Sequence, residues 1–85
     1  MMRAYAPDYS QAALDALLTA SKRRLAQARA AIERLCRGVS AAGDYRWQDA
    51  SGRVWDVTLI DGVVLTYWVD HAVCEVKIGL VEWVE

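Results

Sequence analysis

The sequence predicts an α+β fold in which an N-terminal helical hairpin packs on one face of a four-stranded antiparallel meander sheet. Three observations predict it. Apolar residues recur at steps of three and four up to about residue 38, the period of an amphipathic helix. From about residue 44 the chain is rich in Val, Ile, Thr, Trp and Tyr, which favour strands. Asp61-Gly62, between two such stretches, is typical of a two-residue hairpin turn. We expect helices over about 10–38 and the sheet over about 44–84.

The composition is that of one folded domain. The chain has 85 residues, of which 55% are hydrophobic and 25% charged, too apolar for a disordered chain and too short for two domains. No apolar run approaches the roughly 18 residues that span a bilayer. Asp8 and Asp15 lie where a signal peptide would be apolar. We therefore expect a single domain over 1–85 in a cytoplasmic protein without membrane contact.

Serine and glycine residues mark the ends of the helical part. Ser10 and Ser21 are suitable N-caps for two helices, or the two run together as one. Gly38 and the stretch 40–43 after it end the helical part. The segment 3–5 is either a short first strand before the helices or a loop. The apolar positions of the second helix share one face, and they are Leu25, Ala28, Ile32, Leu35, Cys36 and Val39.

The second half of the chain divides into four strands joined by turns. The strands are Tyr45–Asp49, Arg53–Ile60, Val63–Asp70 and Val73–Val84. A loop at 50–52 places Trp47 opposite Trp55, and a two-residue turn at His71-Ala72 places Trp68 opposite Glu75. Side chains alternate across a strand, so these pairings assign each strand residue to one of two faces.

One face is predicted to pack on the helices because its last two strands carry no charge. It holds Val54, Ile60, Val63, Leu65, Tyr67, Val69, Cys74, Val76, Ile78 and Leu80. The other face holds Val57, Leu59, Val64, Thr66 and Val81, together with the residues that we predict to bind a partner: Tyr45, Trp47, Trp55, Trp68, Trp83, Glu75 and Lys77. Exposed aromatic patches mark interaction surfaces. The alternative is that the four Trp rings form a second small core under the termini or a loop.

Catalytic and metal chemistry has little support in the sequence. Cys36 and Cys74 with the single His71 make no zinc site, and both cysteines are predicted to be buried free thiols. His71 beside Asp70 in a turn is a general-base candidate, although a histidine in a turn is more often simply solvated. The aspartates lack metal-loop spacing, and the sequence has no Gly-rich phosphate loop. We expect no metal and no cofactor.

Charge is divided along the chain. Residues 1–40 hold seven Lys or Arg and three acids, whereas residues 41–85 hold three and eight. The basic half could contact phosphate, but a nucleic-acid binder is usually basic overall, and this chain has a net charge of −1. We therefore interpret Arg23, Arg34 and Arg37 as part of a solvent-exposed helix face.

The order of elements and four short motifs resemble the RelE/ParE toxin superfamily. The motifs are Gly43–Asp49 (GDYRWQD), Gly52–Val57 (GRVWDV), Leu65–Asp70 (LTYWVD) and Val76–Gly79 (VKIG). The resemblance covers nearly the whole chain and implies a small bacterial toxin held by a cognate antitoxin. It also implies one of two activities, cleavage of mRNA on the ribosome or poisoning of DNA gyrase.

The nuclease motif of that superfamily is incomplete here. Leu80-Val81-Glu82-Trp83 follows Gly79, where the nuclease members place basic residues. Lys77 and Arg46 are the only catalytic candidates on the predicted sheet, with Arg53 at its edge. We therefore predict a toxin-like protein that binds a partner: an antitoxin-like protein or a second copy through the Trp-rich face, with gyrase or the ribosome as target. The alternatives are a ribosome-dependent mRNA interferase with atypical catalytic residues and a non-toxic mobile-element interaction module.

Overall fold

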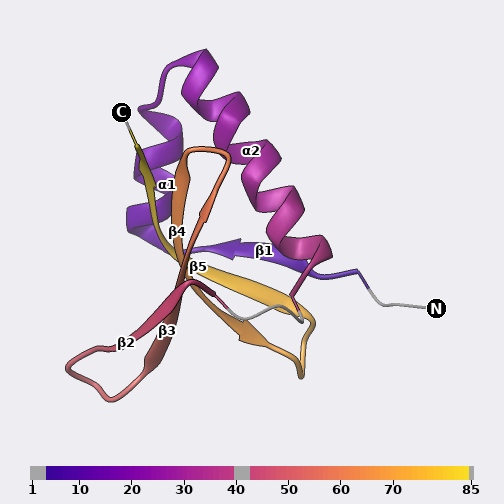
Figure 1. The fold of residues 1–85 in the computed structure, drawn as a ribbon, viewed down its shortest axis with the longest axis vertical. Coiled ribbons are helices and arrows are strands. Elements are labelled where there is room, and N and C mark those ends of the chain that lie inside the picture. Colours follow the sequence, from indigo (N-terminus) through magenta and orange to yellow (C-terminus); the bar gives the residue numbers. More distant parts are fainter. Residues whose placement is uncertain (1–3, 40–42, 85) are drawn as a thin grey trace.

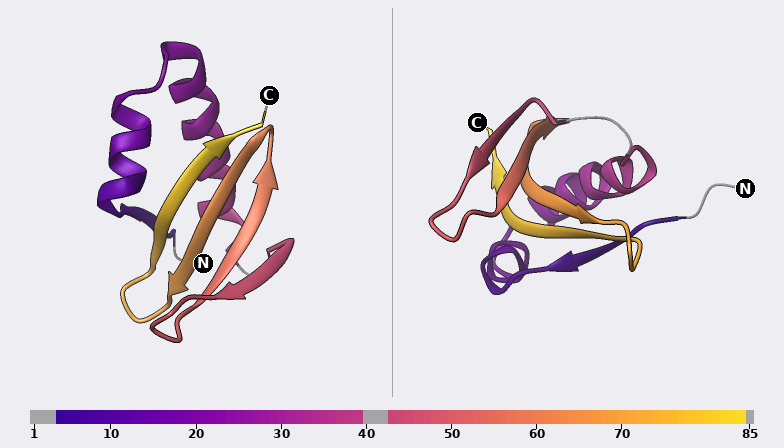
Figure 2. Two further views of the ribbon diagram at one scale, coloured as in Figure 1. Left: turned by 90° about the vertical axis from the view of Figure 1, so that its left-hand side faces the viewer. Right: turned by 90° about the horizontal axis from the view of Figure 1, so that it is seen from below.

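Two helices cover one face of a five-stranded sheet in the computed structural model, which describes residues 4–39 and 43–84 (Figure 1). The elements are β1 (Ala6–Tyr9), α1 (Gln11–Leu18), α2 (Lys22–Arg37), β2 (Tyr45–Gln48), β3 (Val54–Ile60), β4 (Val63–Asp70) and β5 (Glu75–Trp83). Both helices lie on the same side of the sheet, and no helix of the described residues covers the other side (Figure 2). The predicted α+β fold is therefore confirmed.

The sheet is mixed because a first strand joins the predicted meander. Its order is β1-β5-β4-β3-β2, with β2 to β5 antiparallel as expected and β1 parallel to β5. The first strand spans Ala6–Tyr9, not the segment 3–5, of which Arg3 lies outside the described residues. It includes Pro7, which an edge strand tolerates where the missing N–H would face outward. The predicted stretch 40–43 is described only at Gly43.

Both predicted N-caps are present, so the hairpin consists of two separate helices. The Ser10 hydroxyl accepts a hydrogen bond from the Ala13 N–H at 3.1 Å, and the Ser21 hydroxyl accepts one from the Arg24 N–H at 3.2 Å. Gly38 is the C-cap of α2. Each cap satisfies an N–H that the first helical turn leaves unpaired.

The core lies between α2 and the middle of the sheet. Its buried residues from the helices are Ala13, Ala28, Ala31, Ile32 and Leu35, and those from the strands are Val63, Leu65, Tyr67, Val76, Ile78 and Val81. Leu25 and Cys36, predicted for the same face of α2, are half-buried. The pattern confirms the helix-facing assignment for β4 and the first half of β5.

Of two predicted hairpin turns, the one at Asp61-Gly62 is confirmed and the one at His71-Ala72 is wrong. Asp61 and Gly62 have φ of 50° and 82°, as a type I′ turn requires, and Leu59 pairs with Val64 as predicted. The reversal at His71-Ala72 instead takes residues 71–74, with Cys74 at φ 54°. Trp68 therefore pairs with Lys77, not with Glu75. The shift is two residues, so the assignment of faces survives it.

A bulge at Gly79 changes the faces of the second half of β5. Tyr67 pairs with Ile78 and Thr66 with Leu80, which leaves Gly79 unpaired. An extra residue reverses the alternation beyond it. Val81 is consequently buried against the helices and Leu80 is 40% exposed, so the predicted faces of both residues were wrong.

The same reversal moves Trp83 to the helix side. It packs against the core cluster, and its indole Nε1 donates to the Arg24 carbonyl oxygen at 2.9 Å. The Arg24 guanidinium lies 5.9 Å from the centre of its ring. The prediction that all four Trp residues share one face was therefore wrong, and Trp83 leaves the candidate partner site.

Candidate functional site

The sheet face without helices, here called the open face, carries the candidate site. Figure 2 (left) shows this face with β5, β4, β3 and β2 side by side. Register and alternation assign to it Asp8, Tyr45, Trp47, Arg53, Trp55, Val57, Leu59, Val64, Thr66, Trp68, Asp70, Glu75, Lys77, Leu80 and Glu82. Apart from Trp83, every residue predicted to bind a partner lies on this face.

The centre of the open face is a small apolar layer built around two Trp rings. Trp55 lies over Gly79, because a Cβ added at Gly79 would come within 2.6 Å of its ring. The Trp55 Nε1 donates to Asp49 Oδ2 at 2.8 Å. The Arg53 guanidinium lies 4.1 Å from the centre of the Trp68 ring, a cation–π geometry. Trp55 and Trp68 are consequently only half-exposed, which agrees in part with the alternative of a second small core.

Large apolar side chains remain exposed around this centre. Tyr45 is 61% exposed, Trp47 46%, Leu59 55% and Leu80 40%. Tyr45 and Trp47 come from the edge strand β2, where Trp47 is paired with Trp55 as predicted. Aromatic side chains in such positions contribute large contact areas to protein interfaces.

Lys77 is held by two carboxylates. Its Nζ donates to Glu75 Oε1 at 2.6 Å and to Asp8 Oδ2 at 3.0 Å. The hydrogen bonds that Lys77 donates to Glu75 and Asp8 raise the pKa of Lys77 above its ordinary value of 10.5. The lysine therefore stays protonated, and its charge is compensated within the protein. Asp8 was not predicted as a partner of Lys77, because the pairing of β1 with β5 was not predicted.

Arg46, the other catalytic candidate, lies on the opposite side of the sheet from Lys77. It pairs with Asp56 across β2 and β3. Arg46 and Trp47 are adjacent in β2 and point to opposite faces, so the Arg46 side chain projects away from the open face. Its Nε donates to Asp56 Oδ1 at 3.0 Å. The structure does not bring Arg46 and Lys77 together.

Carboxylates outnumber cations on the open face. Asp8, Asp70, Glu75 and Glu82 lie on it by register, against Lys77 and Arg53. Asp49 adds a further carboxylate at the edge of the Trp55 ring. Hydrogen bonds from Ser51 and Trp55 lower the pKa of Asp49 from 3.8 to about 2, so it is charged at neutral pH.

The remaining candidates are accounted for by local structure. The Tyr5 hydroxyl and His71 Nδ1 lie 2.7 Å apart, with the rings edge to face, so His71 has a structural partner. The nearby Cys74 thiol donates to the backbone carbonyl of His71 at 3.7 Å. Cys36 and Cys74 are half-buried free thiols, and burial raises the pKa of the Cys36 thiol. The described residues hold no cluster of three His, Cys, Asp or Glu suited to a metal ion.

No helix of the described part of the chain is long and apolar enough to cross a membrane.

Comparison with solved structures finds two similar chains. One belongs to the RelBE2 toxin–antitoxin complex of Mycobacterium tuberculosis, with a TM-score of 0.75 and 20% identity over 95% of this chain and 99% of that chain. The other belongs to the intact RelBE toxin–antitoxin complex of E. coli, with a TM-score of 0.61 and 18% identity over 96% and 99%. No family model and no curated protein matches the sequence. The chain therefore has a RelE-like toxin fold.

Proposed function

We propose that this chain is the toxin-like component of a toxin–antitoxin module, and that it acts by binding a protein partner without cleaving RNA. The two structurally similar chains both come from toxin–antitoxin complexes. They cover nearly all of this chain, so a role beside an antitoxin-like partner is the first expectation. We choose binding over cleavage on a single observation, which is that the cations of the open face already contact other side chains of the protein.

A ribonuclease site needs cations that can bind phosphate and stabilise developing charge. Lys77 is already engaged by Asp8 and Glu75, and the Arg53 guanidinium lies against the Trp68 ring. The surrounding carboxylates repel a phosphate backbone. This arrangement favours binding of a protein over cleavage of RNA.

The exposed part of the open face provides the contact area that a protein partner needs. Tyr45, Trp47, Leu59 and Leu80 present apolar surface, and their burial would supply most of the affinity. An antitoxin-like protein or a second copy of this chain would cover them. Gyrase or the ribosome is the cellular target that we expect.

Expression in a bacterial host tests the proposal, with growth and mRNA integrity followed together. We expect growth arrest with intact mRNA, and loss of copurification of the antitoxin-like protein or second copy in Trp47→Ala. Leu18→Ala is the matched control, because Leu18 on α1 is 78% exposed and lies away from the open face. Absence of arrest would contradict a toxin-like role. Fragmented mRNA that becomes intact again in Lys77→Ala would instead identify a ribonuclease with atypical residues.

A further inference from the structure

A groove of about 390 Å³ runs between α2 and the edge strand β1, away from the open face. Tyr5 and Tyr9 flank it on the strand side. Ile32 and Cys36 of α2 line its apolar part, and Ile32 is only 3% exposed. The groove can therefore accept an apolar or aromatic side chain beside the two tyrosines.

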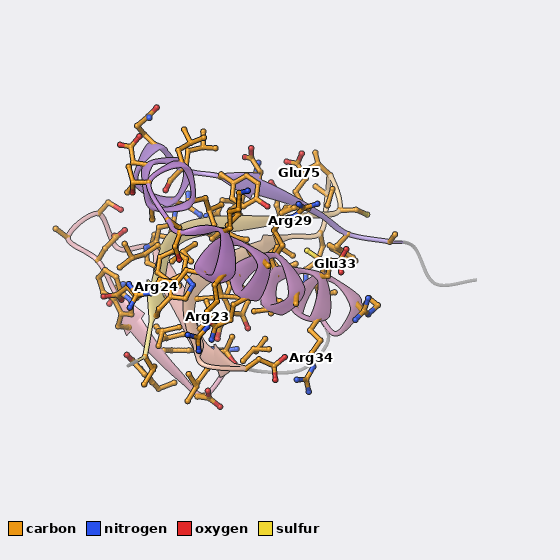
Figure 3. The ribbon with its side chains drawn as sticks, turned by 90° about the horizontal axis from the view of Figure 1, so that it is seen from above. Arg23, Arg24, Arg29, Glu33, Arg34 and Glu75 are labelled. Atoms are coloured by element: carbon orange, nitrogen blue, oxygen red, sulfur yellow. The ribbon has the colours of Figure 1, made fainter. Side chains whose placement is uncertain are left out.

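Two arginines that form no ion pair or hydrogen bond with a described residue border this groove. Arg29 and Arg37 line it, and neither forms an ion pair or hydrogen bond with a described residue. Glu33 lies between them along α2, and Figure 3 shows Arg29 and Glu33 on the side of the helix toward β1, with Arg34 on the other side. Arg34 by contrast is paired with Asp61 at 3.0 Å. The groove thus carries an excess of unpaired positive charge.

The rest of α2 reinforces this charge. The helix holds six Lys or Arg and one acid, Glu33. Such a field raises the local concentration of anionic groups, and a guanidinium binds a carboxylate through paired N–H donors. Charge complementarity therefore favours an acidic ligand for the groove.

The outer edge of β1 adds a feature that is specific for polypeptide. The N–H groups of Ala6 and Ser10 donate to carbonyls of Cys74 and Ile78 in or beside β5. Alternation along the strand therefore turns the backbone groups of Pro7 and Tyr9 outward, where no strand within residues 4–39 and 43–84 lies beside them. Pro7 lacks an N–H, so an added chain would pair through the Tyr9 N–H and nearby carbonyls only.

We propose that the groove between α2 and β1 binds an acidic peptide segment of a partner protein, with an apolar or aromatic side chain inserted beside Tyr5 and Tyr9 and carboxylates on Arg29 and Arg37. A nucleic acid fits less well, because Glu33 interrupts the cations and the floor of the groove is apolar. The site is separate from the open face and independent of the function proposed for that face.

Selection from a peptide display library of random sequence tests this inference. Clones that bind the double variant Arg29→Glu/Arg37→Glu are removed first, and the remainder is selected on the unaltered protein. Both arginines are exposed, so the double variant should fold, which circular dichroism and thermal melting can verify. Lys22→Glu/Arg23→Glu is the matched control, with the same charge change on the same helix outside the groove.

The expected clones are rich in Asp and Glu around an aromatic or aliphatic residue. Their affinity should fall at least about tenfold in the groove variant and less than about threefold in the control, and it should weaken as salt rises from about 50 to about 300 mM. Trp47→Ala should leave it unchanged. Selected clones that are neutral or basic, clones equally weakened by the control variant, or a failure to recover any clone that depends on the arginine pair would overturn the inference.

Discussion

Replacement of Gly79 by Ala tests the contact that shapes the centre of the open face. An added Cβ would lie 2.6 Å from Trp55 Cζ3 and 2.8 Å from Cη2, well inside the roughly 3.5 Å optimum for carbon atoms. The indole must therefore move, which weakens its 2.8 Å hydrogen bond to Asp49. Overpacking of this kind costs about 1–3 kcal/mol, and each kcal/mol lowers the melting temperature of a domain this size by about 4–8 °C.

Urea and thermal unfolding followed by circular dichroism measure this cost. Gly38→Ala is the matched control, because a Cβ at Gly38 meets only the Arg34 carbonyl at 3.6 Å, and it should change stability by less than about 1 kcal/mol. The double variant Gly79→Ala/Trp55→Leu completes a cycle in which removal of the ring should recover much of the Gly79→Ala cost. The packing that we describe is refuted if Gly79→Ala is as mild as the control, or if its cost persists without the ring.

Leu65→Ala removes a fully buried side chain and should lower the free energy of unfolding by about 2–5 kcal/mol; an unchanged urea midpoint would contradict the core assignment. Trp47→Ala should weaken association with a copurified partner by about 2 kcal/mol in calorimetry while the melting temperature stays within a few degrees, whereas a loss of fold would place Trp47 in the core. Because its folded-state pKa is lowered from 3.8 to about 2, Asp49 contributes stability above pH 3.8 that is lost as the pH falls toward 2. In Asp49→Asn, the free energy of unfolding should therefore fall less steeply as the pH is lowered from 3.8 to about 2. An unchanged pH dependence would rule out this contribution of Asp49.

Local signals in the sequence were sufficient for the helices and the central hairpin. Ser10 and Ser21 cap their helices through their own hydroxyls, and Asp61-Gly62 adopts the positive φ angles that its turn requires. Each of these features depends on residues within a few positions of one another. Such short-range chemistry can be interpreted without knowledge of the rest of the fold.

The errors arose where distant residues decide the structure. The bulge at Gly79 accommodates the Trp55 ring from another strand, and one unpaired residue was enough to place Trp83 on the wrong face. The parallel pairing of β1 with β5 joins residues about seventy positions apart, and it brings Asp8 to Lys77. The four-residue reversal relies on Cys74 at positive φ. A positive φ is uncommon at residues other than glycine, so the sequence did not indicate it.

In the candidate site too, features set by nearby residues were predicted and features set by distant residues were not. Alternation correctly assembled Tyr45, Trp47, Trp55 and Trp68 on one face, because the bulge lies beyond them along the meander. It did not indicate which of the rings are covered, since that depends on Gly79 and on the Arg53 side chain. The same alternation applied to β2 places Arg46 and Lys77 on opposite faces, a consequence that the choice of both as catalytic candidates did not take into account.

The most direct test of the central claim is the integrity of mRNA in a translation reaction reconstituted from purified ribosomes and factors, to which the purified protein is added. Because Lys77 is engaged by Asp8 and Glu75, we predict that primer extension shows full-length mRNA at every time point. Cleavage on the ribosome that disappears in Lys77→Ala would contradict the account and make Lys77 a group that stabilises the transition state.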